Sequence, residues 1–353
     1  MRKIVTPLLI AILCLAGCSE EQPPFDDAGR IRIHTELQHA YLQDKIDSIH
    51  EYAIGEQELS RPADAVFSWE GEQKEYKVLL SENPDFNNPK TYSVTTNSVS
   101  FQNLKIDTNY YYRVSSDDIV IKEDHFQISH ENIRNLYISG VTNARDLGGY
   151  YVDGGRLRQG LIFRTARLNH NSVTTPSNLI TAKGIDTMVN DLKVKSEIDL
   201  RMVSNNEVGG LIEGTGVLGE TVKYYQCPMD WTQSYDSEIN TQAVKKIFAI
   251  LGDKDNFPTF FHCSIGTDRT GYIAWLINAC LGLNEYDLYR DYLFSNFGNI
   301  GSRRSRSTID NKYVNTIHNY RGETLKEKTI NYLLDTQIKI NEINTLTEMM
   351  LIK

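Results

Sequence analysis

PTFFHCSIGTDRTG, residues 258–271, joins a short apolar run to the start of a long apolar segment. The run at 258–262 has the length of a buried β-strand, and residues 271–281 are apolar nearly all round, which predicts a buried helix. Between them, Cys263 and Arg269 stand six positions apart, a spacing that none of the other four cysteines shares. A strand that enters a helix through a tight loop is the repeating unit of α/β folds.

The loop has the composition of an anion-binding site that also carries a nucleophile. A tight loop before a helix N-terminus points backbone N–H groups inward, and Gly266 permits a backbone conformation that is costly for other residues. Arg269 offers a planar fork for two phosphoryl oxygens. The same positive surroundings would lower the pKa of Cys263 to roughly 3.5–7.5, so that its thiolate attacks phosphorus. We expect the phosphate to be wrapped by Ser264, Ile265, Gly266, Thr267, Asp268 and Arg269.

Two neighbours complete the expected catalytic loop. The Thr270 hydroxyl is placed to hydrogen-bond the sulfur and ease its departure in the second step. His262 is expected to orient the loop, because a thiolate that is already ionised needs no base. The alternative is a structural one, a buried cysteine at a strand end with a surface arginine nearby, which would leave the framing residues as coincidence.

The run His-Cys-x5-Arg-Thr-Gly resembles the signature loop of the cysteine-based protein tyrosine phosphatase superfamily, and within it the bacterial tyrosine phosphatase family. Segments 143–150, 162–168 and 198–201 support the resemblance, which covers about residues 131–350. It implies two-step hydrolysis of a phosphomonoester with no metal and no cofactor. Thr267 stands where relatives often have lysine, which weakens the case for a highly charged inositol substrate. Arg145 and Asp146 are expected to brace the loop, and Arg164, Arg167 and Arg201 to be surface or ion-pair residues near the pocket.

The leaving oxygen needs a proton, and two carboxylates compete to supply it. Asp230 follows a predicted strand and lies 33 residues before Cys263, a spacing similar to that of the mobile acid loop of the superfamily. Asp268 lies inside the loop, where some related phosphatases carry their acid. The sequence slightly favours Asp230. The structural alternatives are a turn residue for Asp230, and for Asp268 an ion pair with Arg145 or Arg201.

The N-terminus carries a targeting signal. MRKIVTPLLIAILCLAGC, residues 1–18, has a basic start and an apolar run too short to cross a bilayer. Its end resembles a bacterial lipoprotein signal, so we expect a signal peptide at 1–17, a lipid on Cys18, and anchorage to a bacterial membrane outside the cytoplasm, the outer membrane being favoured. An ordinary cleaved signal is the alternative. The formal net charge of −9 argues against nucleic-acid binding.

Residues 18–60 are expected to form a polar tether over 19–35 and a weakly patterned helix over 36–53, and residues 61–129 a β domain. Short strands at 66–69, 76–80, 91–94, 99–101 and 110–114 alternate with turn residues, which is typical of a β-sandwich. The segment 104–114 resembles a fibronectin type III domain, which implies a corner hydrogen bond by Tyr110 and a core role for Trp69. We expect this domain to be a spacer or a protein-docking module without chemistry.

Residues 130–353 are expected to be the catalytic domain, an α/β fold with a mostly parallel central sheet flanked by helices. Strands are predicted at 196–200, 222–226 and 258–262, and helices at 185–192, 239–251, 271–281, 284–297 and 323–350. Two functions from different classes remain open. One is a phosphatase, whose substrate is a phosphotyrosyl protein, with dual specificity as a variant, or a small phosphomonoester such as a phosphoinositide or inositol phosphate. The other is a lipoprotein that only binds phosphorylated ligands.

Overall fold

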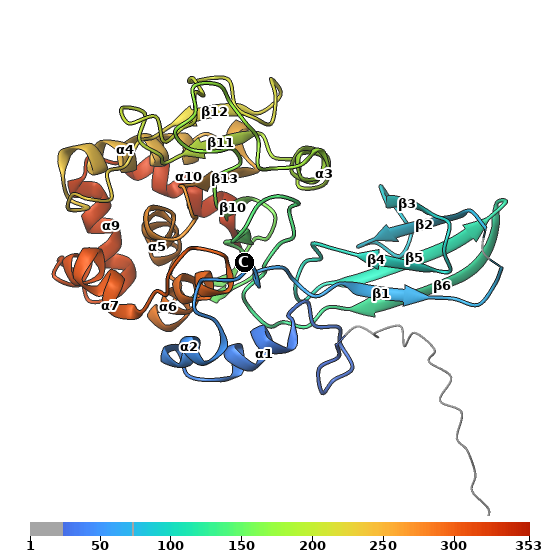
Figure 1. Ribbon diagram of the computed structural model, residues 1–353. Coiled ribbons are helices and arrows are strands. Elements are labelled where there is room, and N and C mark those ends of the chain that lie inside the picture. Colours follow the sequence, from blue (N-terminus) through green and yellow to red (C-terminus); the bar gives the residue numbers. More distant parts are fainter. Residues whose placement is uncertain (1–23, 73) are drawn as a thin grey trace, which may run out of the picture.

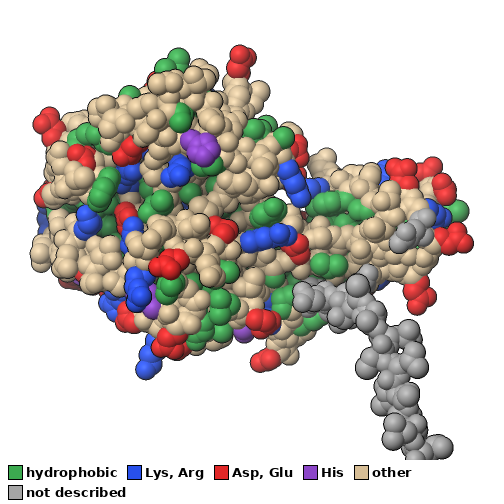
Figure 2. Space-filling view, in the orientation of Figure 1, with side chains coloured by type: hydrophobic (Ala, Val, Ile, Leu, Met, Phe, Trp, Pro, Cys, Tyr) green, Lys and Arg blue, Asp and Glu red, His purple; other side chains and the backbone are tan. Residues whose placement is uncertain are grey.

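The computed structural model describes residues 24–72 and 74–353. A β-sandwich projects from a larger body of mixed α/β structure (Figure 1). Figure 2 shows the same elongated outline, with acidic side chains gathered at the far end of the sandwich. The predicted signal peptide and Cys18 lie outside the described residues.

The sandwich consists of two antiparallel sheets. The corner hydrogen bond expected of Tyr110 is present: the backbone N–H of Lys105 donates to its hydroxyl over 2.8 Å. Trp69 is buried and meets Tyr76 edge to face. The two-stranded sheet pairs β1 (Ala65–Ser68) with β4 (Ser98–Phe101), and the other has the order β3 (Lys90–Val94), β2 (Tyr76–Ser81), β5 (Asn109–Ser116), β6 (Ile119–Gln127).

The segment before the sandwich is more ordered than the polar tether predicted over 19–35. Ile31 and Ile33 are buried in the sandwich core, and Ile31 forms a parallel bridge with Ile128. In an extended chain, residues two positions apart point to the same side, so Ile31 and Ile33 both add apolar side chains to the sandwich core. The prediction of a tether is therefore wrong for this part of the segment.

The predicted helix at 36–53 is broken into three short pieces that pack on the α/β body. Thr35 starts the first piece with a capping box, in which its hydroxyl accepts from the N–H of Gln38. Tyr41 is fully buried, and its ring packs against Phe297. The pieces are α1 (Glu36–Gln43), the 3₁₀ helix η1 (Ile46–Ser48) and α2 (Ile49–Tyr52).

The central sheet of the body has five strands in the order β12-β11-β13-β10-β7. Its first three pairings are parallel and the last is antiparallel, as expected of a mostly parallel α/β sheet. The strands are β7 (Arg145–Asp146), β10 (Ile162–Thr165), β11 (Ser196–Asp199), β12 (Lys223–Gln226) and β13 (Thr259–His262). A small sheet of β8 (Tyr151–Val152), β9 (Gly155–Leu157) and β14 (Leu351–Ile352) lies outside it.

Successive residues of the central strands point to opposite faces of the sheet and pack into two different hydrophobic cores. Phe261 and Ile198 belong to the large core built with the C-terminal helices, whereas Phe260 belongs to the smaller core that includes Met188 and Leu192. Burial on both faces explains why the consecutive residues Phe260 and Phe261 of β13 are both apolar, instead of alternating with polar residues.

The helices agree with the predicted segments at most positions. The helix at 185–192 starts earlier and ends in a π-helical turn, 323–350 divides into two helices, and the short helices between 306 and 318 were not predicted. Among the described residues, no helix combines the length and apolarity needed to cross a bilayer. The helices are α3 (Ala182–Asp186) with η2 (Thr187–Asp191), α4 (Glu238–Leu251), η3 (Lys254–Asn256), α5 (Asp268–Leu281), α6 (Glu285–Leu293) with η4 (Phe294–Phe297), α7 (Arg306–Ile309), η5 (Asp310–Val314), α8 (Asn315–His318), α9 (Leu325–Asp335) and α10 (Ile340–Met350).

Candidate active site

Cys263 directly follows the central strand β13 at the carboxyl edge of the sheet, and residues 263–267 form the loop that connects this strand to α5. The Cys263 side chain is buried, with 2% of the residue exposed. Within the described part of the chain, the backbone N–H groups of residues 264–267 donate to no acceptor. Unpaired N–H groups at a helix N-terminus form a site for an anion.

Gly266 adopts a backbone conformation that only glycine adopts at little cost. Its φ is +69°, and a Cβ there would lie 2.5 Å from the carbonyl oxygen of Thr165. Both the left-handed backbone and the close approach to β10 therefore demand glycine at this point of the loop.

The loop carbonyls are held from behind by two residues that the sequence analysis did not assign to this role. Asn143 donates through Nδ2 to the carbonyl oxygens of Ile265 (3.2 Å) and Gly266 (3.0 Å). Arg164 donates to the Gly266 carbonyl over 2.8 Å. With their carbonyls bound on this side, the peptide groups leave their N–H groups for a ligand.

One buried carboxylate anchors both of these braces. Asp291 of α6 pairs with Arg164 at 2.5 Å and with Arg145 at 3.0 Å, and Arg145 also donates to the side chain of Asn143. Burial alone would raise the pKa of Asp291, but the two guanidinium groups outweigh it and lower the pKa. Arg145 thus reaches the loop through Asn143.

Asp146 does not reach the loop, contrary to the sequence-based expectation. Its carboxylate pairs with Arg134 at 2.5 Å and accepts the N–H groups of Gly148 and Gly160. Consecutive residues of an extended strand point to opposite sides, so Arg145 faces the loop while Asp146 faces the sandwich.

The Arg269 guanidinium is held through one nitrogen, Nη1, which leaves its Nε–Nη2 edge nearly free of partners. Nη1 donates to Glu207 (2.7 Å) and to the carbonyl oxygens of Leu200 and Met229. Among the described residues the Nε–Nη2 edge makes a single contact, from Nη2 to Ser264 Oγ at 3.3 Å. That edge is the one that binds two phosphoryl oxygens side by side.

Glu207 is a functional residue that the sequence analysis missed. Burial would raise the pKa of its carboxyl, but the hydrogen bond and charge of Arg269 lower it instead. It comes from the irregular segment after β11, and no spacing rule relates it to Arg269, so no signal in a single sequence marks it.

The electrostatics of the loop favour a thiolate. Burial raises the pKa of Cys263, but the charge of Arg269, together with the polar hydroxyl and N–H of Thr270, more than compensates, so the pKa lies below its usual value. The Thr270 hydroxyl is fully buried and has no hydrogen-bond partner among the described residues. Cys227 and Cys280 are buried free thiols whose pKa is raised by burial to about 12.

His262 is fully buried directly before the nucleophile and faces two carboxylates. It lies 3.0 Å from Glu197 and 3.9 Å from Asp199. Burial would lower its pKa, but these two carboxylates raise it above the usual value. Asp199 in turn pairs with the fully buried Arg201 at 2.7 Å. This network fixes the end of β13 at the position where the nucleophile follows.

The two candidate acids have different surroundings. Asp230 lies in the loop after β12, beside Met229, and among the described residues its carboxylate accepts only from Thr232 and Gln233 of the same loop. Hydrogen bonds from Thr232 lower its pKa, with a smaller effect from Arg269.

Asp268 is bound to other elements. It pairs with Arg304 at 3.0 Å and accepts from the Tyr292 hydroxyl. Its predicted structural partners, Arg145 and Arg201, were therefore the wrong ones: both are held by other carboxylates. The described residues contain no cluster of three or more side chains suited to hold a metal ion.

Of the other residues predicted to bind substrate, Ser264 and Ile265 lie at the loop surface, whereas the Thr267 side chain points into the protein. Ser264 Oγ lies between Arg269 and Asn171, and Ile265 is partly exposed at the loop surface. The Thr267 side chain turns into the scaffold, where it accepts from Asn143 and donates to the Ile265 carbonyl. Only its backbone N–H faces the anion site.

A low-pKa cysteine, a ring of unpaired amides and a fixed arginine at the carboxyl edge of a parallel sheet define a cysteine-based phosphatase. Comparison with known proteins agrees. Residues 136–343, more than half of the chain, match the Tyrosine phosphatase family. The chain belongs to that family.

Individual relatives are distant. A protein from Cupriavidus necator, provisionally named a tyrosine-protein phosphatase, is 26% identical over 185 residues. The match covers 46% of this chain and 63% of that protein, so the chain spans less than two thirds of its length.

Two solved structures are similar at low scores. The core catalytic domain of the PP-IP phosphatase Siw14 from S. cerevisiae has a TM-score of 0.28 at 16% identity, covering 45% of this chain and 88% of that one. A Cys-to-Ser variant of TpbA from P. aeruginosa, in complex with phosphotyrosine, has 0.31 at 15% identity, covering 49% and 87%.

Proposed function

We propose that this protein hydrolyses phosphomonoesters through a phosphocysteine at Cys263, and that phosphotyrosyl proteins are its substrates. The observation that carries the proposal is the set of unpaired N–H groups at 264–267 around a thiol whose pKa is lowered. The Cys263 thiolate attacks phosphorus, the phosphorus–oxygen ester bond breaks, and the leaving oxygen takes a proton from a carboxylic acid. Water then attacks the phosphocysteine, which releases inorganic phosphate and restores the thiolate.

Asp230 is the acid that we favour. Among the described residues its carboxylate accepts only from Thr232 and Gln233 of its own loop, so a side-chain rotation can direct it to the leaving oxygen while its backbone stays bound to Asn240 of α4. A bound phosphate dianion would raise its pKa toward the protonated form. Asp268, the first residue of α5, is bound to Arg304 and Tyr292, which hold its carboxylate in place.

Hydrolysis of p-nitrophenyl phosphate and of phosphotyrosyl peptides tests the proposal. We expect turnover that vanadate inhibits and chelators do not, and that Cys263→Ser abolishes. Tight phosphopeptide binding without turnover in the unmodified protein would instead identify a binding protein. Faster hydrolysis of phosphoinositides or inositol phosphates than of any phosphopeptide would overturn the substrate class and keep the chemistry.

The same assay identifies the acid. Asp230→Asn should lower turnover of alkyl phosphates about 10²-fold or more, and of p-nitrophenyl phosphate much less, because the latter leaving group needs little protonation. If Asp268→Asn alone gives that pattern, Asp268 is the acid.

We also propose that the protein is anchored outside the cytoplasm by a lipid on Cys18. Residues 1–18, with their basic start, short apolar run and terminal Leu-Ala-Gly-Cys, support this location. Metabolic labelling with a radioactive fatty acid, compared between the unmodified protein and Cys18→Ala, tests it. The fibronectin type III-like sandwich would then hold the catalytic body away from the membrane surface.

A further inference from the structure

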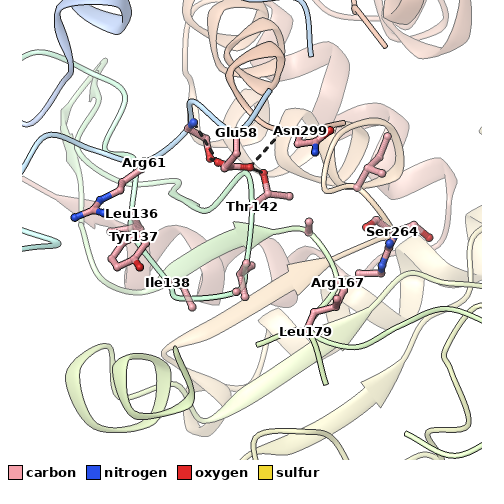
Figure 3. A pocket seen from close by; sticks show the side chains of 15 residues that line it. Glu58, Arg61, Leu136, Tyr137, Ile138, Thr142, Arg167, Leu179, Ser264 and Asn299 are labelled. Carbon is pink, nitrogen blue, oxygen red and sulfur yellow. Dashed lines mark hydrogen bonds between the residues drawn. The ribbon is translucent and has the colours of Figure 1, made fainter. Parts of the chain in front are cut away.

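A groove runs from the phosphate loop to the segment that precedes the sandwich. It encloses about 420 Å³, within the range of about 300–1,000 Å³ typical of ligand sites. Figure 3 shows Arg167 and Ser264 at one end and Arg61 with Tyr137 at the other. Because Ser264 and Ile265 of the phosphate loop line it, a substrate held by that loop can extend directly into it.

One wall of the groove comes from outside the family's catalytic region. Residues 58, 60 and 61 line it, whereas the family match begins at residue 136. The wall is held in place by Gln38, which donates to the carbonyl oxygens of Leu59 (2.6 Å) and Arg61 (3.0 Å), and by Asn135, which donates to that of Ser60 (2.9 Å). The groove is therefore a built feature of this chain.

The middle of the groove is apolar and its ends are cationic. Arg167 lies beside the phosphate loop, donates to the Ser264 carbonyl over 3.2 Å, and has no carboxylate partner among the described residues. Arg61 stacks 4.3 Å over the Tyr137 ring and pairs with Asp64 at 2.7 Å, and Lys183 lies 5.9 Å from the same ring. The apolar lining between them is formed by Leu136, Ile138, Val141, Leu179 and Ile265.

Glu58 is the one acidic residue among the described residues that line the groove, and its carboxylate is already fully hydrogen-bonded. The Glu58 carboxylate accepts from the Ser60 hydroxyl and N–H, from the Thr142 hydroxyl and from the Asn299 N–H. It therefore has no free lone pair with which to recruit a cationic ligand. Arg61 already has a carboxylate partner in Asp64, so the lining charge without one among the described residues is that of Arg167, in a protein whose net charge is −9.

We propose that this groove binds the peptide segment beside the phosphotyrosine, and that it selects acidic side chains there. This rests on the proposed function. An apolar trench with guanidinium groups at both ends suits peptide side chains mixed with carboxylates, whereas an inositol polyphosphate would place charged groups against the apolar lining.

The test compares phosphotyrosyl peptides that differ only in their flanking residues, glutamate in one set and lysine in the other. For the unmodified protein we expect kcat/KM to be about fivefold higher for the glutamate peptides, the factor that corresponds to one partly exposed ion pair of about 1 kcal/mol. Arg61→Glu should abolish or invert this ratio, and Arg61→Ala should give an intermediate value. Arg321→Glu is the matched control, because Arg321 is exposed, pairs with Asp335 and does not line the groove.

Each outcome separates the two proposals. If p-nitrophenyl phosphate is not hydrolysed, the proposed function fails. If it is hydrolysed but the peptide ratio is one, or is the same in Arg61→Glu as in the unmodified protein, the groove proposal is overturned while the function stands. If Arg61→Glu slows hydrolysis of phosphoinositide vesicles but not of peptides, the groove serves a lipid headgroup and the peptide proposal is likewise overturned.

Discussion

At the scale of single residues, the site depends on how charge is distributed around one sulfur atom. Burial of Cys263 opposes ionisation, whereas Arg269 and Thr270 promote it, and the balance lowers the pKa. The rate of alkylation of Cys263 by iodoacetamide should therefore reach half its maximum at a pH below about 8.5, the midpoint of an ordinary cysteine. Inorganic phosphate should protect the thiol, because it occupies the same loop. Mass spectrometry of the Cys263 peptide measures both effects.

Thr270→Val provides the control for that experiment. It keeps the shape of the side chain but removes the hydroxyl, so the midpoint should move to higher pH, since a group that stabilises the thiolate is lost. Cys227 and Cys280, with pKa values of about 12, should stay unmodified below pH 9. A midpoint at or above that of free cysteine would mean that the loop does not hold a thiolate.

Sequence alone was sufficient for residues that are contiguous in the loop and insufficient for those that support it. Cys263 and Arg269 were predictable because one tight turn fixes their relation. Glu207, Asn143 and Asp291 were not, because they come from separate elements and meet the loop only after the sheet and α6 have packed. For the same reason Asp268 was given the wrong arginine partners.

At the scale of elements, the turn from β13 to α5 depends on Gly266. Gly266→Ala would place a Cβ at 2.5–2.7 Å from backbone atoms of Thr165 and Ala166, which cannot move without displacing β10. We expect a loss of about 2–4 kcal/mol in unfolding free energy and a loss of most activity. Gly154→Ala is the matched control: its φ is also positive, +91°, but nothing lies within 4 Å of the added Cβ. It should cost only about 1 kcal/mol, measured by chemical denaturation.

Equal loss of unfolding free energy in the two alanine variants would show that the close contact of Gly266 with β10 contributes nothing to stability.

Other elements could be predicted from the sequence to the extent that their own side chains follow a hydrophobic pattern. The sequence analysis missed β6, which lies at the edge of its sheet and is exposed along most of its length. Its sequence, IVIKEDHFQ, does not alternate regularly between apolar and polar residues. The break of 323–350 into two helices falls at 336–339, which the apolar spacing alone does not reveal.

At the scale of the whole molecule, a buried ion pair joins the sandwich to the catalytic body. Arg134 donates to the carbonyl oxygens of Asn103 and Leu104 in the sandwich and pairs with Asp146 of β7. Both side chains are almost completely buried. Asp146, which the sequence analysis assigned to bracing the phosphate loop, thus helps to hold the sandwich against the catalytic body.

Two isosteric variants separate the roles of junction and loop. Asp146→Asn leaves Arg134 buried without its counter-charge and should cost about 3–5 kcal/mol of unfolding free energy, with little change in kcat for p-nitrophenyl phosphate. Asp291→Asn weakens the hold on Arg145 and Arg164, and through them on the loop, so it should lower both stability and kcat. Chemical denaturation and steady-state kinetics on the two variants give both quantities. If Asp146→Asn reduced kcat as strongly as Asp291→Asn, the junction would have to be coupled to the phosphate loop after all.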